Sequence, residues 1–400
     1  MVTQKDTLAV HAGEPRPKPY HALTVPTVQT STYTFADTAE ILAFMAQKEA
    51  EEPPFSESGP LREEYGRYGN PTIQAAEEKL AALEGGERAV LFASGMAAIT
   101  STLLTFLSAG DHAIFVRDSY RRTRQFAAEY LPQWGVETTL IPIDELDGLE
   151  GAIQSNTRLI FGETPTNPYL RIMDLSRTAD IAKSRDVLTV VDTTFATPLN
   201  LHPLALGIDL VIHSATKYLG GHNDLLAGGV VGSRALIDEV EESRGILGGI
   251  GSPHDAYMLV RGMKTVALRI RRQNESALAL ARHLDDHPAI ARVYYPGLTS
   301  HPDHAVATQQ MEGFGGVVSF TVDATKEETS AFMDRLQIPH IGPTLGGVES
   351  IAQQQALFVS LDPEKRRASG VSDTLIRYAV GIEAVDDLIA DLDQALAPLT

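Results

Sequence analysis

The middle of the chain alternates short apolar runs with longer segments of helical periodicity. Residues 71–85 begin with a proline and end with a glycine, and their apolar side chains recur at the spacing of one helix face. Six apolar runs, each separated from the next by a helix-length segment, lie at residues 88–93, 112–116, 139–143, 158–163, 187–192 and 208–213. Runs that are apolar on both faces are typical of a mostly parallel sheet covered by helices. The pattern therefore predicts an α/β domain.

The two ends of the chain differ from this pattern. Residues 1–64 show little periodicity, and residues 47–64 are polar, charged and rich in turn formers, which predicts an arm with an insertion rather than an independent domain. Residues 264–288 read as one long helix, and the strands and helix after it predict a smaller C-terminal α+β unit. We therefore expect an N-terminal arm over residues 1–64, a large domain over 65–260 and a C-terminal domain over 261–400.

Composition and charge narrow the possible partners. The chain has 400 residues and a formal charge of −19, which disfavours binding to nucleic acid or to anionic membranes. Basic runs at residues 121–124 and 269–273 are more typical of a solvated face than of a site. The sequence has no apolar run of about 18 residues and no apolar leader, so we expect a cytoplasmic protein without a membrane span. It has no cysteine, which excludes disulfides, thiolate metal sites and a cysteine nucleophile.

One lysine stands out just after the last apolar run. Lys217 lies close to Ser214 and Thr216 and is followed by a glycine-rich loop. A lysine shielded by apolar or cationic neighbours has a lowered pKa and can bind a carbonyl group covalently. Asp192 ends the preceding apolar run, and a protonated pyridine nitrogen would be a suitable partner for a buried carboxylate there. The pair indicates a pyridoxal phosphate site, although Asp192 alone could equally be a helix cap or a satisfied core aspartate.

Two further segments suit a phosphate group. Gly95 and Met96 begin a predicted helix directly after a strand, so that free backbone N–H groups and a positive helix end could face an anion. A plain strand-to-helix turn is the alternative. Tyr65 and Arg67 lie on one side of an extended segment and together suit a phosphate dianion. A surface salt bridge beside a packed tyrosine is the alternative there.

An aromatic residue and an arginine complete the candidate chemistry. Tyr120 follows a predicted strand, where its ring could stack on a flat cofactor, although a core aromatic is the favoured alternative on this observation alone. Arg377 lies in a predicted strand of an acidic chain, and its planar fork suits a substrate carboxylate. The histidines at residues 301–304 lack the spacing of a zinc site, and no GxSxG motif occurs. We therefore predict no metal site and no serine hydrolase.

Taken in order, these motifs resemble the pyridoxal-phosphate enzymes of cysteine and methionine metabolism. The resemblance runs from residue 6 to residue 397 and is carried by YGRYGNPT, SGMAAI, ETPTNP, VDTTFATP, DLVIHSATKYLGGHN, RGMKT, VYYPGL, FGGVVSF and LIRYAVG. It implies an aspartate-aminotransferase-like fold, with a mostly parallel seven-stranded sheet in the large domain and a smaller C-terminal α+β domain. It also implies pyridoxal 5′-phosphate as cofactor, amino-acid substrates and a homotetramer of two catalytic dimers.

The resemblance assigns roles to particular residues. It implies that Lys217 binds the cofactor aldehyde and moves protons between Cα and Cβ, that Asp192 keeps the pyridine nitrogen protonated, and that Tyr120 stacks on the ring and takes part in catalysis. The remaining cofactor-binding residues would be Gly95, Met96, Thr194, Ser214 and Thr216, with Tyr65 and Arg67 from the neighbouring subunit. The substrate α-carboxylate would be bound by Arg377, Asn167 and Ser350.

Within this family, the motifs look most like those of the plant-type cystathionine γ-synthases and their bacterial relatives. Glu349 occupies the position where synthases and cystathionine lyases carry a glutamate that can meet a distal amino group. We therefore expect γ-replacement on an O-acyl-L-homoserine by L-cysteine. The alternative is a γ-lyase that cleaves cystathionine, methionine or a less usual γ-substituted amino acid to a 2-oxo acid and ammonia, or to homoserine. An alternative of another class is a cofactor-binding regulator without turnover.

Four features depart from the usual family pattern. Arg122 brings bulk and charge to a segment that is normally glycine-rich, and we expect it at the pocket mouth as a substrate-binding residue. Gln354 and Gln355 replace a usual His-Pro pair, the insertion at residues 47–64 is longer than usual, and Thr193 replaces an asparagine. The first three departures predict an unusual substrate, with a cationic or amide-like distal group, whereas no prediction is made from Thr193.

Overall fold

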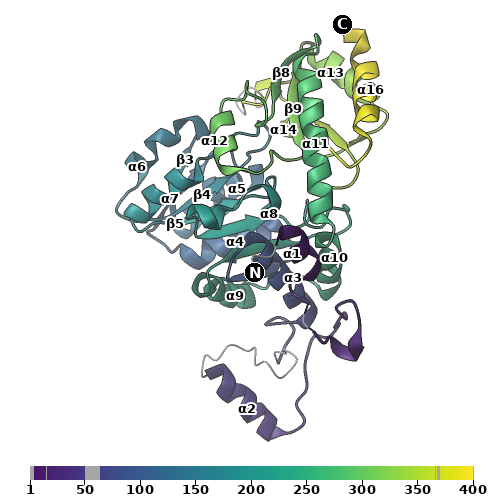
Figure 1. The fold of residues 1–400 in the computed structure, drawn as a ribbon. Coiled ribbons are helices and arrows are strands. Elements are labelled where there is room, and N and C mark those ends of the chain that lie inside the picture. The colour runs from purple at the N-terminus through teal and green to yellow at the C-terminus, as the bar shows by residue number, and fades with distance from the viewer. Residues whose placement is uncertain (1–3, 15, 50–63, 365, 367–369, 400) are drawn as a thin grey trace.

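The computed structural model describes residues 4–14, 16–49, 64–364, 366 and 370–399. The structure has two lobes, each built around one sheet (Figure 1). Helix α11 (Val266–Asp285) runs beside the smaller of the two sheets. The large lobe holds a seven-stranded sheet and the small lobe a five-stranded sheet. This arrangement confirms the predicted fold class.

The large sheet has the strand order β1-β7-β6-β5-β4-β2-β3. Its strands are β1 (Arg88–Phe92), β2 (His112–Val116), β3 (Glu137–Ile141), β4 (Thr157–Glu163), β5 (Leu188–Asp192), β6 (Leu210–His213) and β7 (Gly228–Gly232). Strands β3, β2, β4, β5 and β6 pair in parallel, whereas β7 runs antiparallel to both of its neighbours. Each of the six predicted apolar runs forms a strand of this sheet.

Strand β7 was not predicted from the apolar pattern because it contains three glycines. A Cβ atom on Gly229 would lie 2.4 Å from Cδ2 of Leu80, and one on Gly228 would lie 2.2 Å from the carbonyl oxygen of Ser94. The glycines therefore allow one helix and the start of another to approach the sheet closely. Because three of the five residues of β7 are glycines, the strand has too few apolar side chains to be recognised as an apolar run.

The helices lie at the following positions: α1 (Lys5–His11), α2 (Thr38–Glu49), α3 (Pro71–Glu84), α4 (Gly95–Phe106), α5 (Arg121–Gln125), α6 (Leu149–Ala152), α7 (Leu175–Ser184), α8 (Thr197–Asn200), α9 (Arg234–Leu247), α10 (Pro253–Met263), α11, α12 (His304–Gln310), α13 (Lys326–Arg335), α14 (Gln355–Val359) and α16 (Val385–Leu396). Both faces of the large sheet are covered. Val190 belongs to the core that packs on α4 and α9, and Val191 to the core that packs on α7. Consecutive strand residues point to opposite faces, so helices cover this sheet on both sides.

Helix α3 shows how local signals set an element's ends. The Asn70 side chain accepts hydrogen bonds from the N–H groups of Thr72 and Ile73, and Gly85 ends the helix with a left-handed φ of 78°. Asparagine is a favoured N-cap, and glycine adopts this conformation without steric cost. The predicted helix over residues 71–85 is thereby confirmed.

The small sheet has the strand order β10-β11-β12-β9-β8. Its strands are β8 (Ile290–Tyr294), β9 (Val317–Val322), β10 (His340–Ile341), β11 (Ile351–Gln354) and β12 (Leu375–Ala379). Three of its four pairings are antiparallel and β10 pairs with β11 in parallel. Leu280 of α11, Phe332 of α13 and Leu392 of α16 are buried in the core of this lobe. The expected α+β unit is present.

The boundaries expected for the domains remain predictions. Helix α12 lies beyond residue 260, yet its Ala307 is buried in the same core as Ile114 of the large sheet. Helix α1 packs on α3, where the buried Lys79 donates to the carbonyl oxygens of Ala9 (3.0 Å) and Val10 (3.2 Å). Helix α2 stands away from the two lobes (Figure 1) and exposes Leu42 to solvent. Most of the predicted insertion, residues 50–63, lies outside the described residues.

The described residues include no helix that is both long and apolar enough to cross a membrane. Within the same ranges, no group of three or more histidine, aspartate or glutamate side chains is arranged to hold a metal ion.

Candidate active site

A lysine, a threonine and an arginine meet where the two lobes adjoin. The Nζ atom of Lys217 donates to Oγ1 of Thr344 at 2.9 Å, and the carbonyl oxygen of Thr344 accepts from Nη2 of Arg377 at 3.1 Å. Gly346 has a φ of 84°, and a Cβ atom there would lie 2.7 Å from the backbone nitrogen of Tyr218. The turn that carries Thr344 therefore packs directly on the backbone around Lys217, and only glycine fits at that contact.

The environment of Lys217 changes its protonation. Burial, followed by the positive charge of Arg377, lowers the pKa of Lys217 to about 8. Both causes disfavour the charged form of an amine. At this pKa about one lysine side chain in ten is neutral at pH 7. A larger neutral fraction is what an amine that binds a carbonyl group requires, and the role of Lys217 remains a prediction.

Arg377 is a buried cation whose described partners are all uncharged. Besides Thr344, its guanidinium donates to Oδ1 of Asn167 (3.3 Å) and to Oε1 of Gln353 (2.7 Å), while its Nε atom has no hydrogen-bond partner in the described part of the chain. Burial lowers the pKa of Arg377 to about 10. A buried charge is stable only when it is paired. The site consequently suits a ligand that brings a carboxylate to Arg377.

The loop between β4 and α7 presents Asn167 to this arginine. Tyr169 donates its hydroxyl to the carbonyl oxygen of Gly370 (2.9 Å) and accepts from the N–H of Ser372 (3.1 Å). Arg171 forms two hydrogen bonds of 2.6 and 3.1 Å with the carboxylate of Asp303. A bidentate arginine–carboxylate pair fixes geometry well. The loop is thus held just after Asn167, by Tyr169 to the segment before β12 and by Arg171 to the residue that precedes α12.

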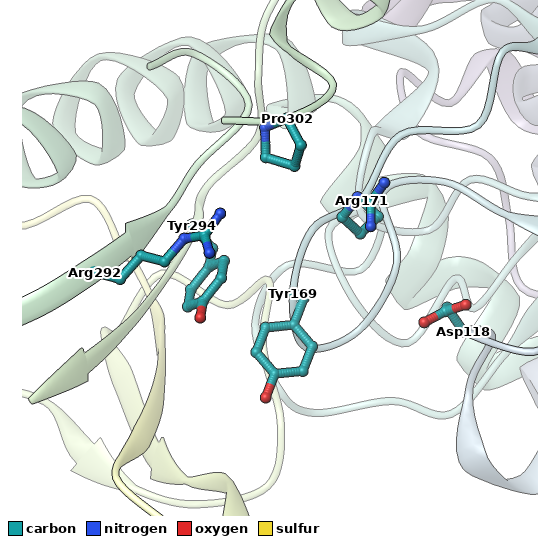
Figure 2. A pocket seen from close by; sticks show the side chains of 6 residues that line it. All are labelled: Asp118, Tyr169, Arg171, Arg292, Tyr294 and Pro302. Carbon is teal, nitrogen blue, oxygen red and sulfur yellow. The ribbon is translucent and has the colours of Figure 1, made fainter. Parts of the chain in front are cut away.

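A cavity of about 170 Å³ lies beside this loop, lined by Asp118, Tyr169, Arg171, Arg292, Tyr294 and Pro302 (Figure 2). The rings of Tyr169 and Tyr294 lie 5.0 Å apart, and the guanidinium of Arg292 lies 5.0 Å from the ring of Tyr294. None of the predicted site residues lines this cavity. Its arginines already contact an acid or an aromatic ring, so we do not place the reaction here.

The ends of β5 and β6 are joined through Asp192. Its Oδ1 atom accepts from the backbone N–H (2.9 Å) and the hydroxyl (2.6 Å) of Thr194, whose Oγ1 in turn accepts from the N–H of Ser214 (2.8 Å). Burial raises the pKa of Asp192, while the Thr194 bonds and His213 oppose that shift. Within the described residues Oδ2 has no hydrogen-bond partner. That oxygen is available to a donor such as a protonated ring nitrogen.

The start of α4 faces Ser214. Gly95 and Met96 are the first two residues of α4, so their N–H groups have no partner inside the helix. A Cβ atom on Gly95 would lie 2.9 Å from Cβ of Ser214, which shows how closely the two segments approach. Thr216, by contrast, forms hydrogen bonds through its hydroxyl with the backbone of Ala227 (2.9 and 3.2 Å). Gly95, Met96 and Ser214 therefore offer a cradle for an anion.

Tyr120 is not a core aromatic. It precedes α5, and its side chain is 43% exposed. Its backbone N–H donates to Oε2 of the buried Glu163 at 2.5 Å. Tyr120 also influences the pKa of Arg377, which places the two residues near each other. The ring is thus free to contact a ligand at the same end of the sheet.

Tyr65 and Arg67 contact each other rather than the Lys217 group. The guanidinium of Arg67 lies 5.5 Å from the ring of Tyr65 and 4.8 Å from that of Tyr68. It also donates to the carbonyl oxygen of Gly245 at the end of α9. A role for Tyr65 and Arg67 in the site of a neighbouring subunit remains a prediction.

Two predicted substrate-binding residues lie on the surface. Arg122 is exposed on α5 and donates to the side chain of Gln125 (2.6 Å). Glu349 is also exposed, and its carboxylate accepts from Nδ2 of Asn223 (2.9 Å), which belongs to the loop after Lys217. Glu349 therefore lies near the site, whereas the described contacts of Arg122 do not connect it with Arg377.

The side chain of Ser350 is engaged away from Arg377. Its hydroxyl donates to Glu383 (2.9 Å) and accepts from the N–H of Gly381 (2.9 Å). These bonds do not support the expected contact of its hydroxyl with a substrate carboxylate, which stays a prediction.

The interpretation of Gln354 as a marker of an unusual substrate is wrong. Strand β11 pairs Gln353 with Arg377, so the next residue, Gln354, points to the opposite face. The Gln354 side chain bonds to Ser330 (2.8 Å) and to the carbonyl oxygens of Lys326 (3.2 Å) and Asp373 (2.9 Å). It stabilises the packing of α13 on the small sheet. Gln353 is the glutamine that contacts the site.

Three residues of the site were not predicted from the sequence: Thr344, Gln353 and Glu163. Thr344 contacts Lys217 across the junction of the lobes, and Gln353 contacts Arg377 from the neighbouring strand of the small sheet; no local pattern signals either contact. Glu163 could have been found, because it ends an apolar strand as Asp192 does on the next one.

The donor set fits pyridoxal 5′-phosphate. Asp192 has a free oxygen for the ring nitrogen, α4 and Ser214 form an anion cradle, and Lys217 is an amine with a lowered pKa. When bound, this cofactor supplies an electron sink for the substrate.

Comparisons with known proteins identify the family. The sequence pattern of the Cys/Met metabolism PLP-dependent enzymes matches residues 6–397. The chain is 46% identical over 395 residues to cystathionine gamma-synthase 1, chloroplastic, of Arabidopsis thaliana, covering 98% of this chain and 68% of that protein. The crystal structure of metB from Corynebacterium glutamicum has a TM-score of 0.90 and 35% identity, covering 100% of this chain and 99% of that one. The cystathionine gamma-lyase of Lactobacillus plantarum complexed with L-serine has a TM-score of 0.89 and 36% identity, covering 99% of each chain. The chain therefore belongs to the PLP-dependent enzymes of cysteine and methionine metabolism, and pyridoxal 5′-phosphate is its cofactor.

Proposed function

We propose that this enzyme joins an O-acyl-L-homoserine to L-cysteine and produces L-cystathionine. In this γ-replacement the bond from Cγ to the acyl oxygen breaks, and a bond from Cγ to the cysteine sulfur forms. The observation that carries the proposal is the uncompensated Arg377 beside Lys217, since it provides a carboxylate site next to an amine with a lowered pKa. The identity of 46% to a cystathionine gamma-synthase supports the choice of this reaction.

Each residue of the site has a task in this proposal. Arg377 and Asn167 bind the α-carboxylate and orient Cα toward Lys217. Lys217 accepts the proton from Cα and then moves protons at Cβ, as a general base with a pKa near the working pH should. Thr344 holds the Lys217 amine between these transfers. Asp192 would hold the ring nitrogen of the bound cofactor in its protonated form, and Tyr120 would contact the ring.

The incoming cysteine needs a second contact. Glu349 is exposed beside Asn223 of the loop after Lys217, and we assign its carboxylate to the amino group of cysteine. A thiol nucleophile must come from a substrate, because the chain has no cysteine.

The quaternary structure and location are part of the same proposal. We infer a homotetramer of two catalytic dimers, in which Tyr65 and Arg67 bind the cofactor phosphate of the neighbouring subunit. Their described contacts outside the Lys217 group support this, as does the exposure of Leu42 on α2. We also expect a cytoplasmic enzyme.

A γ-lyase is the second candidate. The structural similarity to the cystathionine gamma-lyase of Lactobacillus plantarum favours it, and Lys217, Arg377 and Asp192 would serve γ-elimination equally well. The product would then be 2-oxobutanoate with ammonia rather than cystathionine.

The decisive experiment supplies O-succinyl- or O-acetyl-L-homoserine with and without cysteine, and in a separate incubation cystathionine alone, and follows cystathionine and 2-oxobutanoate by mass spectrometry. The proposal predicts that cystathionine dominates when cysteine is present. Rapid release of 2-oxobutanoate from cystathionine, with no cystathionine formed from acyl-homoserine, would instead establish the lyase. The Lys217→Ala variant is the control for turnover at this site.

A further inference from the structure

Two carboxyl groups share one buried position in the large sheet. Glu163 and Asp192 end the neighbouring parallel strands β4 and β5 and are paired in register. Paired residues of adjacent strands point to the same face, and here it is the face of Phe161 and Val190, which packs on α4. Glu163 is 5% exposed and Asp192 is 7% exposed. The two acids are therefore buried side by side at the cofactor end of the sheet.

Buried acids this close do not both stay ionised, because each charge disfavours the other. Asp192 receives two hydrogen bonds from Thr194 on one oxygen, which favours its charged form. Burial and then the charge of Asp192 raise the pKa of Glu163 well above its usual range, and Asp118 adds to this shift. The Tyr120 N–H and Arg124 oppose it without reversing it. The proton of the pair thus resides on Glu163.

The hydrogen bond from Tyr120 gives Glu163 a structural task. The Tyr120 N–H donates to Oε2 of Glu163 at 2.5 Å, and the hydroxyl of Tyr120 forms no hydrogen bond within the described residues. The carbonyl oxygen of Tyr120 also accepts from the N–H of Arg124 (3.0 Å), one turn later in the chain, so Glu163 is the hydrogen-bond partner that ties the half-exposed Tyr120 to the large sheet.

We propose that Glu163 is a positioning residue: it stays protonated, anchors the backbone of Tyr120, and so fixes that ring over the cofactor while Asp192 remains the single charged acid for the ring nitrogen. The part that concerns the ring rests on the proposed role of Tyr120.

The first test measures pyridoxal phosphate affinity by titrating the apoprotein. Glu163→Gln keeps a neutral side chain with an acceptor oxygen, so its dissociation constant should stay within about 3-fold of wild type. Glu163→Leu removes the acceptor and should weaken binding about 10-fold, with an altered circular dichroism of the bound cofactor. Glu239→Gln, on the exposed face of α9, is the matched control. Equal losses in Glu163→Gln and Glu163→Leu would show that a charged Glu163 is needed and would overturn the proposal.

A double-mutant cycle asks whether Glu163 acts through Tyr120. In a Tyr120→Ala background the ring is absent, so Glu163→Leu should no longer weaken cofactor binding by more than about 2-fold. An undiminished 10-fold loss in that background would contradict the positioning role. If Tyr120→Ala alone leaves affinity and circular dichroism unchanged, the assignment of Tyr120 to the ring fails instead.

The protonation of Glu163 is tested separately on the apoprotein. The folded state keeps this proton above about pH 4, where the unfolded chain loses it, so the folded state binds more protons and stability falls as pH rises. Denaturant unfolding of wild type from pH 5 to 8 should show this fall, and Glu163→Gln should reduce it, whereas Glu239→Gln should not. Identical pH slopes for wild type and Glu163→Gln would overturn the claim that Glu163 is protonated, whatever Tyr120 does.

Discussion

The amine of Lys217 donates a hydrogen bond of 2.9 Å to the hydroxyl of Thr344, which lies 127 positions later in the chain. The same threonine accepts from Arg377 through its carbonyl oxygen (3.1 Å). One residue therefore links the amine proposed to transfer protons to the cation proposed to bind substrate. Because Thr344 lies between β10 and β11 of the small sheet and Lys217 follows β6 of the large sheet, the correct docking of the two lobes is a condition for assembling the site.

Removing the hydroxyl of Thr344 should slow turnover more than it weakens substrate binding. Thr344→Val keeps the backbone contact to Arg377 but leaves the Lys217 amine unheld, so we expect kcat to fall by roughly 10- to 100-fold, as when a general base loses its orientation. Thr344→Ser restores the hydroxyl and should recover most of the rate. Steady-state kinetics of cystathionine formation measure both. A normal kcat in Thr344→Val would show that the bond is not used in catalysis.

Cofactor loading should depend on pH through Lys217. Only the neutral amine attacks the cofactor aldehyde, and the pKa of Lys217 is lowered to about 8 by burial and by Arg377. The rate of reconstitution of the apoprotein should therefore rise about tenfold per pH unit below pH 8 and level off above it. In Arg377→Gln the midpoint should move upward, because a positive neighbour is lost. Stopped-flow absorbance gives the rates, and a midpoint near 10 in wild type would contradict the lowered pKa.

Much of the fold was predictable because burial leaves a pattern. Five consecutive buried residues of β2 read as an apolar run, and Asn70 and Gly85 mark the ends of α3. Strand β7 was not predictable by that rule, since Gly228 and Gly229 are there to make room for other segments. The apolar pattern predicts which side chains are buried. It gives no signal where a segment is buried by close approach of backbones and therefore carries glycine.

The cofactor residues were predictable for a different reason from the substrate residues. Lys217 and Asp192 lie at the ends of recognisable strands, so their position can be read locally. Gln353 reaches Arg377 only after β11 has paired with β12, and Thr344 reaches Lys217 only after the two lobes have docked. The error over Gln354 has a similar cause. Neighbouring residues of β11 point to opposite faces of the sheet, so that Gln353 contacts Arg377 and Gln354 contacts α13. The sequence does not show the pairing register that decides which glutamine faces the site.

This alternation makes a direct prediction for the two glutamines. Gln353→Leu removes a buried acceptor of Arg377 and should raise KM by about 5- to 20-fold. Gln354→Leu should leave KM nearly unchanged but lower the free energy of unfolding by about 1 to 3 kcal/mol, because the backbone carbonyl groups and Ser330 lose their partners. Steady-state kinetics and denaturant unfolding are measured on both variants, and each variant is the control for the other. The opposite assignment of effects would return Gln354 to the substrate site.

Arg377 should be required for catalytic activity but not for the stability of the apoprotein. Arg377→Met replaces a buried guanidinium, whose described partners are all neutral, by an apolar side chain that fits a strand of the core. Because a buried charge without a counterion is costly, the apoprotein should gain about 1 to 3 kcal/mol in stability. The loss of a charge-assisted contact to the α-carboxylate should at the same time lower kcat/KM by at least about 10- to 100-fold. Thermal unfolding of the apoprotein measures the effect on stability, and kinetics of the holoenzyme measure the effect on kcat/KM. A destabilised apoprotein would mean that the neutral partners around Arg377 already satisfy its charge, and the argument for a substrate carboxylate at this position would lose its basis.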